Sequence, residues 1–196
     1  MKNIFIITIL LLSITGCSQT FPLYLAHSQE AGKYYKDIDN DLNKFQGTWK
    51  YTNGSTSLTI VLRKKTQVVN PFRNFTTDML IGEYSYIHNG IQQANTIGLM
   101  ESNSSTYGGN NIYGATLGKC DECPTGGKNL VFLSFSDPAA SYLNSQMSVK
   151  YYVENGIEKI KIGLKPENYV HTGELPALPS GYVPVPIDKY ILIKQP

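Results

Sequence analysis

Two cysteines three positions apart are the residues of this chain best suited to chemistry. Cys120 and Cys123 enclose Asp121 and Glu122, and their spacing serves a redox dithiol, half of a zinc site or a disulfide within one turn. A redox dithiol needs a stabilised thiolate, which the two intervening carboxylates oppose. Structural zinc needs four ligands, and the sequence has no second cysteine pair to supply the rest. We therefore expect a structural disulfide between Cys120 and Cys123.

Other patterns typical of catalysis or metal binding are weak. The histidines are scattered along the sequence, at His27, His88 and His171. They lack the spacing of metal ligands. The acidic run 37–41 begins like a calcium loop, but Leu42 stands where that loop needs glycine and Thr48 where it needs glutamate. We expect no metal, no cofactor and no enzymatic activity.

Composition limits the classes of partner. The chain has 196 residues, of which 41% are hydrophobic and 16% charged, and its formal net charge is +2. These values indicate one globular domain with a weakly charged surface. The short basic cluster Arg63–Lys65 ends an expected strand, where we expect it to solvate the strand end. We therefore expect no binding to nucleic acid.

The N-terminus has the layout of an export signal. Lys2 precedes a run that is apolar from Ile4 to Leu12, apart from Thr8. A helix of this length spans about 14 Å, roughly half of a bilayer core, so the run is too short to cross a membrane. We expect residues 1–16 to be a removable signal peptide. Export leads to an oxidising compartment, which favours the disulfide.

The end of the signal, Leu12-Ser13-Ile14-Thr15-Gly16-Cys17, resembles the lipobox of bacterial lipoproteins. The resemblance implies that Cys17 carries a lipid and becomes the first residue of the mature chain. Two or more acyl chains, each contributing ~0.8 kcal/mol per buried methylene, form a stable anchor. The protein would then lie at the bacterial outer membrane, on the periplasmic side. The alternative is cleavage after Ser18, which leaves a soluble periplasmic or secreted protein beginning at Gln19.

Three Asn-Gly pairs predict β-hairpins: Asn53-Gly54, Asn89-Gly90 and Asn155-Gly156. An Asn-Gly pair between extended runs favours a type I′ turn, because both central residues of that turn have positive φ. The flanking runs alternate apolar and polar residues, as half-buried antiparallel strands do. The expected strands are 48–52, 57–62, 80–88, 91–99, 130–135, 147–154, 157–164 and 190–193.

The other segments are expected to be irregular or helical. Residues 17–33 form a polar, lipid-anchored tether, and a short helix is expected over 34–43. The stretch 101–119 is expected to be a mobile loop, and 166–186 holds five of the ten prolines. About eight strands in one domain, 34–196, must close into a barrel or split into a sandwich. We expect a mostly β, antiparallel meander closed into a barrel, with a β-sandwich as the alternative.

Gly47 and Trp49 open the first expected strand. A Gly-x-Trp motif after a short helix resembles the start of lipocalins and related calycin barrels, which implies that Trp49, with Gly47, plugs the closed end of a lipocalin-like barrel. Longer stretches resemble an uncharacterised family of small secreted proteins and lipoproteins of Gram-negative bacteria. These stretches are 18–23, 35–49, 78–82 and 192–195. That resemblance implies no activity and no catalytic residues.

Three functions are compatible with an exported β-barrel. An interaction or structural module of the cell envelope needs a solid barrel with an exposed patch. A protein that binds a small apolar ligand needs a cavity inside the barrel. A thiol-disulfide enzyme based on Cys120 and Cys123 needs a thiol of lowered pKa. We favour the interaction module over the other two, so the expected partners are the membrane, through the anchor, and an envelope protein or a small apolar ligand.

We predict that the mature chain begins with an acylated Cys17. Because the lipid would hold the protein to the membrane, Cys17→Ala should move the protein from the membrane fraction to the soluble fraction of broken cells. Mass spectrometry of the N-terminal peptide of the native protein checks the acylation. A native chain that begins at Gln19 would contradict the prediction.

Overall fold

The computed structural model describes residues 20–23, 29–100, 107–118, 128–140, 142, 144–167 and 176–196. Several residues singled out from the sequence lie outside this part: Cys17, His27, Cys120, Cys123 and His171, together with the expected signal peptide, residues 1–16. Within the described residues, none of the helices has the length and apolar character needed to cross a membrane.

The described residues include eleven strands and two 3₁₀ helices. The strands are β1 (Thr20–Pro22), β2 (Tyr34–Lys36), β3 (Gly47–Asn53), β4 (Thr56–Asn70), β5 (Phe75–His88), β6 (Ile91–Asn95), β7 (Ile112–Gly118), β8 (Leu130–Phe135), β9 (Ser145–Glu154), β10 (Ile157–Pro166) and β11 (Lys189–Lys194). The 3₁₀ helices are η2 (Asn43–Phe45) and η3 (Ile97–Leu99).

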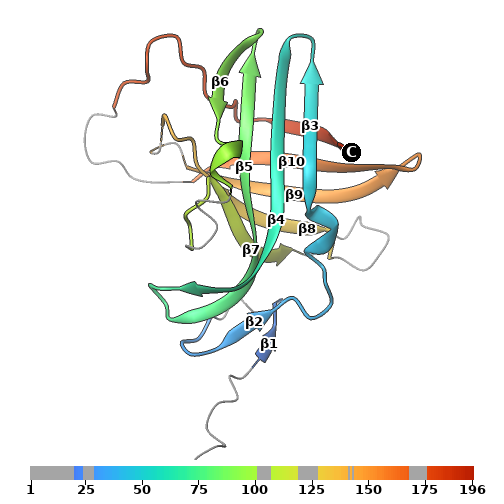
Figure 1. The fold of residues 1–196 in the computed structure, drawn as a ribbon, viewed down its shortest axis with the longest axis vertical. Helices are drawn as coiled ribbons and strands as arrows, with labels where there is room; N and C mark the ends of the chain where they lie inside the picture. Colours follow the sequence, from blue (N-terminus) through green and yellow to red (C-terminus); the bar gives the residue numbers. More distant parts are fainter. Residues whose placement is uncertain are drawn as a thin grey trace, which may run out of the picture.

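Eight of these strands close into an antiparallel barrel, as expected. Their order is β5-β4-β3-β11-β10-β9-β8-β7, and β7 returns to β5 through three residue pairs, from Leu80↔Gly114 to Gly82↔Ile112 (Figure 1). The same edge of β5 also pairs with β2 on one side of this closure and with β6 on the other. Strand β5 therefore joins the barrel wall to the strands outside it.

The three predicted hairpins are confirmed, and two of them have the expected turn. Asn89-Gly90 and Asn155-Gly156 have positive φ at both positions, from 50° to 80°. The first hairpin differs, because Asn53 pairs with Thr56 and the two-residue loop is Gly54-Ser55. In this loop only Gly54 has positive φ, at 58°, so the predicted type I′ turn is wrong there.

The helix expected over 34–43 is wrong. Tyr34–Lys36 forms β2 instead, because it pairs in parallel with β5. The chain then turns at Asp37, whose carboxylate accepts the backbone N–H of Asp41 at 2.8 Å. A side chain that binds the backbone in this way competes with a regular helix. The helical residues are Asn43–Phe45, in η2.

The loop expected over 101–119 is also wrong in its second half, because Ile112–Gly118 is the closing strand β7. A register shift between Tyr113 and Thr116 interrupts the alternation by which a strand is recognised. Gly114 lies in this bulge with φ of 153°, and a Cβ there would lie 2.9 Å from the carbonyl oxygen of Phe132. The bulge thus requires glycine, and it interrupts the period-two pattern from which the strand could have been predicted.

Strands β4 and β5 extend well beyond their expected bounds. The cluster Arg63–Lys65 therefore lies within β4 rather than at a strand end, and Lys64 forms an ion pair with Asp37 at 2.7 Å. Residues of the expected tether also join the fold, since β1 pairs in parallel with β2 and Leu23 is buried in the core. Strand β6, by contrast, is shorter than expected, because it ends at Asn95 whereas the expected strand covered 91–99.

Buried side chains fill the barrel along its axis. An eight-stranded barrel is about wide enough for its own side chains to fill it. The following inward-facing residues from all eight strands are at most 2% exposed: Trp49, Leu58, Ile60, Leu62, Leu80, Tyr84, Ile112, Val131, Leu133, Met147, Val149, Ile160, Ile162 and Leu192. These side chains make the barrel a packed core.

Trp49 fills one end of this core. Its indole N–H donates to the carbonyl oxygen of Phe45 at 2.8 Å, and its ring meets Tyr151 edge-on at 6.3 Å. The ammonium group of Lys194 lies 5.5 Å from the centroid of the Trp49 ring. Gly47 has φ of 129°, and a Cβ at this position would lie 3.2 Å from Lys194. That Gly47 and Trp49 are required to close this end stays a prediction.

A proline-rich segment, residues 176–188, lies at the opposite end and is called the strap below. Its Val183 donates a backbone hydrogen bond to the side-chain oxygen of Gln93 in β6, at 2.9 Å. Tyr190 donates to the carbonyl oxygen of Pro186 at 2.9 Å, and Val185 is buried in the core. The strap is thus held at both β6 and β11.

The carboxylate of Asp78 in β5 is 1% exposed and accepts three hydrogen bonds. Tyr34 of β2 donates its hydroxyl at 2.6 Å, and the backbone N–H groups of Gln67 and Asp37 donate at 3.1 and 3.0 Å. Gln67 has φ of 56° and lies in the bulge of β4. One buried charge therefore holds β2, the bulge of β4 and the turn at Asp37 against β5.

Asp78→Asn should lower the free energy of unfolding by about 2 kcal/mol. The amide has one acceptor oxygen, whereas two of the three partners of Asp78 are backbone N–H groups that can only donate, so a buried hydrogen bond would be lost and a donor left unsatisfied. Urea denaturation followed by circular dichroism measures the change. Asp188→Asn is the control, because Asp188 is exposed and should change stability by less than about 0.5 kcal/mol. Equal effects of the two substitutions would refute the assigned role of Asp78.

Candidate functional site

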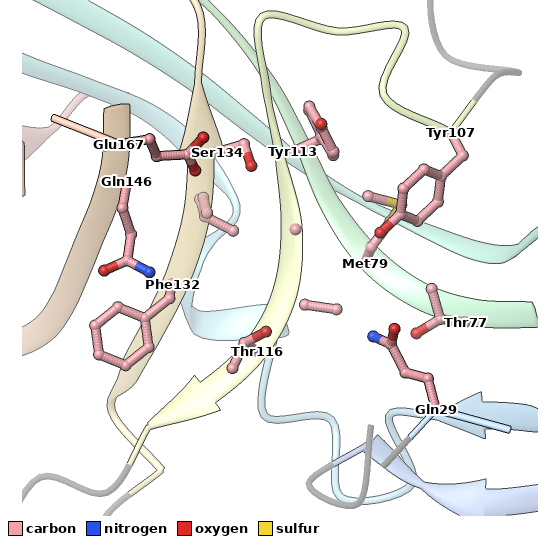
Figure 2. A pocket seen from close by; sticks show the side chains of 13 residues that line it. Gln29, Thr77, Met79, Tyr107, Tyr113, Thr116, Phe132, Ser134, Gln146 and Glu167 are labelled. Carbon is pink, nitrogen blue, oxygen red and sulfur yellow. The ribbon is translucent and has the colours of Figure 1, made fainter. Parts of the chain in front are cut away.

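A groove of about 160 Å³ crosses the outer face of the barrel (Figure 2). Strand β7 runs through the middle of it, with residues of β5 on one side and residues of β8 and β9 on the other. The residues that line it are Gln29, Thr77, Met79, Tyr107, Tyr113, Gly114, Ala115, Thr116, Phe132, Leu133, Ser134, Gln146 and Glu167. The groove therefore brings together segments that are far apart in the sequence.

Strand β7 shapes the floor of the groove. Gly114 has no side chain, and the bulge shifts the register. The backbone of β7 therefore forms a low floor between Tyr113 and Thr116. Alternation along β8 points Phe132 and Ser134 outward, while Leu133 packs into the barrel. The bulge that closes the barrel thus also creates the groove.

A second apolar cluster supports one wall of the groove from outside the barrel. Val68, Met79, Ile81 and Met100 are each at most 6% exposed and form this cluster. Tyr107 and Tyr113 pack against it, with their ring centroids 5.7 Å apart in an edge-on contact. The aromatic wall is therefore held by packing.

Hydrogen bonds to Glu83 fix the segment that carries Tyr107. The carboxylate of Glu83 has no exposed surface, and the amides of Asn110 and Asn111 donate to its two oxygens at 3.0 and 2.7 Å. Charge-assisted hydrogen bonds of this kind are stronger than neutral ones. Tyr107, a few residues before this pair, is thereby placed beside β5, so the groove is preformed.

The chemistry of the groove suits binding. Hydroxyl and amide groups of Thr77, Thr116, Ser134 and Gln146 offer donors and acceptors around the rings of Tyr107, Tyr113 and Phe132. Neither histidine nor lysine is among the lining residues that the structure describes. Glu167 adds a carboxylate at one rim.

A smaller polar group lies at the strap end of the barrel. Asp137, which is 2% exposed, accepts the hydroxyl of Tyr182 at both oxygens, at 2.5 and 2.6 Å. The hydroxyl of Tyr84 is buried beside this pair. A hollow of about 180 Å³ adjoins Asp137 and is lined mainly by Phe135, Val185, Ile187 and prolines of the strap.

The residues predicted to form sites do not meet in the described part of the chain. Cys17, Cys120 and Cys123 lie outside it, so the lipid attachment and the disulfide stay predictions. His88 contacts Tyr86 and Asn89 at the hairpin turn. The described residues contain no group of three or more histidine, cysteine, aspartate or glutamate side chains suited to a metal ion.

Ion pairs account for the acidic run 37–41. Asp37 binds Lys64, while Asp39 and Asp41 both bind Lys128. The groove was not predicted from the sequence. The signal that could have indicated it is the presence of Tyr107 and Tyr113 in an otherwise polar, glycine-rich stretch, because aromatic side chains there need a surface to pack on.

Buried tyrosines should make the fold sensitive to alkali. Burial, assisted by a hydrogen bond to Glu158, raises the pKa of Tyr151 to about 12. Burial is also the main cause that raises the pKa of Tyr84, Tyr182 and Tyr190 above the ordinary value. Above pH 10 the unfolded chain releases these protons first, so the stability that Tyr151 contributes is complete below pH 10 and is lost as the pH rises through 12. The other three tyrosines lose their contribution at higher pH.

We expect the native protein to show tyrosinate absorbance in two phases, with the buried tyrosines ionising together with the loss of circular dichroism. The same titration in concentrated urea is the control and should show one phase near the ordinary pKa of tyrosine. A native titration that coincides with the one in urea would mean that these hydroxyl groups are exposed.

Comparison with known proteins gives a family but no activity. No curated protein and no solved structure matches the chain. A family model, described as a family of unknown function (DUF6705), matches residues 1–195. This agrees with the uncharacterised family expected from the sequence, while export and lipidation stay predictions. Since the match covers nearly the whole sequence, the chain belongs to this family of unknown function, DUF6705.

Proposed function

We propose that the protein is a lipoprotein of the cell envelope that acts as an interaction module. In this proposal Cys17 anchors the chain at the outer membrane, and the barrel presents the groove around Tyr107 and Tyr113 to a partner protein. The barrel performs no reaction itself.

The observation that carries this proposal is the filled interior of the barrel. Proteins that carry small ligands in a barrel enclose a cavity lined by inward-facing side chains. Here Trp49 and Tyr84 occupy that space, and neither has any exposed surface. In this proposal binding takes place on the outside, where the groove lies.

The size of the groove favours a protein partner over a free small molecule. Pockets for small molecules commonly enclose about 300–1,000 Å³, and the groove holds about 160 Å³. That volume suits one large side chain of a partner, seated between the rings of Tyr107 and Phe132. Anchoring side chains of this kind dominate the affinity of protein interfaces.

A second candidate function is the binding of a small apolar ligand under the strap. The hollow beside Asp137 favours it, because Phe135, Val185 and Ile187 give that hollow an apolar lining. Its volume of about 180 Å³ limits the ligand to a few carbon atoms. Native mass spectrometry of protein purified from its own envelope tests this candidate through the mass of a bound ligand.

Photo-cross-linking in living cells tests the interaction module. With a benzoylphenylalanine residue at Thr116, on the rim of the groove, we expect cross-linking to a defined envelope protein. Ser134→Arg should fill the groove and weaken binding by about 2 kcal/mol, or roughly thirtyfold, and so remove the cross-link. Immunoblotting and mass spectrometry identify the product.

Matched controls separate the groove from the rest of the surface. Thr59 lies outward on β4, away from the groove, so the cross-linker at Thr59 and the variant Thr59→Arg should leave the Thr116 product unchanged. Both Arg variants should melt within a few degrees of the native protein. The proposal fails if Thr59 gives the same product as Thr116, or if Ser134→Arg leaves the product intact.

A further inference from the structure

Strands β9, β10, β11 and β3 share an outer face whose composition is unlike the rest of the barrel. Ile160, Ile162 and Leu192 point into the core, so their neighbours along each strand point outward. The register aligns these outward residues in rows: Tyr152–Lys159–Ile193–Lys50, Lys150–Lys161–Ile191, Ser148–Gly163–Lys189 and Gln146–Lys165. We call this surface the lysine face.

The lysine face concentrates positive charge. Its lysines are Lys50, Lys150, Lys159, Lys161, Lys165 and Lys189. Within these four strands the outward positions include a single acidic residue, Glu154, which pairs with Lys159 at 2.6 Å. The whole chain has a net charge of only +2, so the remainder of the chain is net acidic.

The register also places like charges next to each other. Lys150 and Lys161 are directly opposite each other on neighbouring strands, and like charges in this relation destabilise a sheet. Lys161, Lys165, Lys189 and Lys50 are exposed. A surface that gathers exposed like charges suits an anionic partner.

Exposed aliphatic side chains lie among these lysines. Ile157, Ile191 and Ile193 are 46%, 50% and 44% exposed. Strands β3 and β11 pair at two positions, and beside this short pairing lies a shallow groove of about 470 Å³ lined by Lys50, Tyr51, Ile191 and Ile193 among others. Lysine ammonium groups around exposed isoleucines are the pattern by which peripheral proteins bind a lipid surface.

The positive charges of this face come from lysine and not from arginine, which limits the class of partner further. Arginine binds phosphate and carboxylate groups in a fixed two-point geometry, whereas lysine acts as a flexible point charge. The lysine face contains no arginine, and the chain has its two arginines elsewhere, at Arg63 and Arg73. Point charges around apolar side chains suit a fluid layer of headgroups better than the ordered phosphates of a nucleic acid.

We propose that the lysine face binds the anionic phospholipid surface of a membrane. The ammonium groups contact headgroup phosphates, and Ile191 and Ile193 enter the interface beside them. This contact is independent of the groove around Tyr107 and of the lipid on Cys17. The two surfaces adjoin on β9, where Gln146 lines the groove and lies opposite Lys165.

Vesicle flotation tests the proposal with the mature chain carrying Cys17→Ser, so that no acyl chain contributes. The protein should float with vesicles of equal parts phosphatidylcholine and phosphatidylglycerol, and not with phosphatidylcholine alone. Each lysine near an anionic surface contributes a factor of about five in affinity, so Lys161→Gln with Lys189→Gln should weaken binding roughly thirtyfold. Binding should also weaken as salt is raised.

A control pair and a second test pair make the result decisive. Lys36→Gln with Lys65→Gln changes the net charge equally outside the lysine face, and should weaken binding less than about twofold. Ile191→Ser with Ile193→Ser should reduce the binding that persists at high salt, while the melting temperature stays within a few degrees. Flotation with phosphatidylcholine alone, equal losses for the two lysine pairs, or tighter binding to a single-stranded oligonucleotide would each overturn the proposal.

Discussion

The buried carboxylate of Asp78 is the interaction on which the arrangement of the N-terminal half depends. It lies on β5, the strand whose free edge must accommodate β2, β7 and β6 in succession. By accepting the N–H of Asp37, Asp78 positions a second buried carboxylate, which in turn accepts the N–H groups of Asp41 and Leu42 and the ammonium group of Lys64. This turn leads directly into η2 and then to Trp49. Two carboxylates thus connect the outer strands to the side chain that fills one end of the barrel.

Local signals in the sequence were sufficient for most strands but not for the segments governed by distant contacts. The hairpins at Asn89-Gly90 and Asn155-Gly156 were predictable because a type I′ turn depends on its two central residues. Residues 34–43 were predicted to form a helix because Asp and Asn are common at helix starts. In the structure Tyr34 and Tyr35 pair with the backbone of β5 instead. Strand β7 was not predicted because a bulge at Gly114 breaks the period-two pattern.

The candidate surfaces could not be predicted from the sequence for a related reason. The groove takes residues from Gln29 to Glu167, and only the closed barrel brings these together. The lysines of β9 and β10 were visible as alternating residues of two strands. Their alignment with Ile191, Ile193 and Lys50 follows from the register with β11 and β3, which no turn signal specifies. Single lysines in the sequence therefore gave no indication of a charged surface.

The seam between β3 and β11 has a consequence for how the chain can fold. Lys50, near the start of the domain, pairs with Ile193, near its end. A barrel whose first and last wall strands are neighbours cannot close until the whole chain is available, and such distant contacts form slowly. For a chain that we propose is exported, late closure keeps the barrel open until translocation is complete. On that proposal, the barrel closes on the far side of the membrane only after the C-terminal strand has followed the rest of the chain.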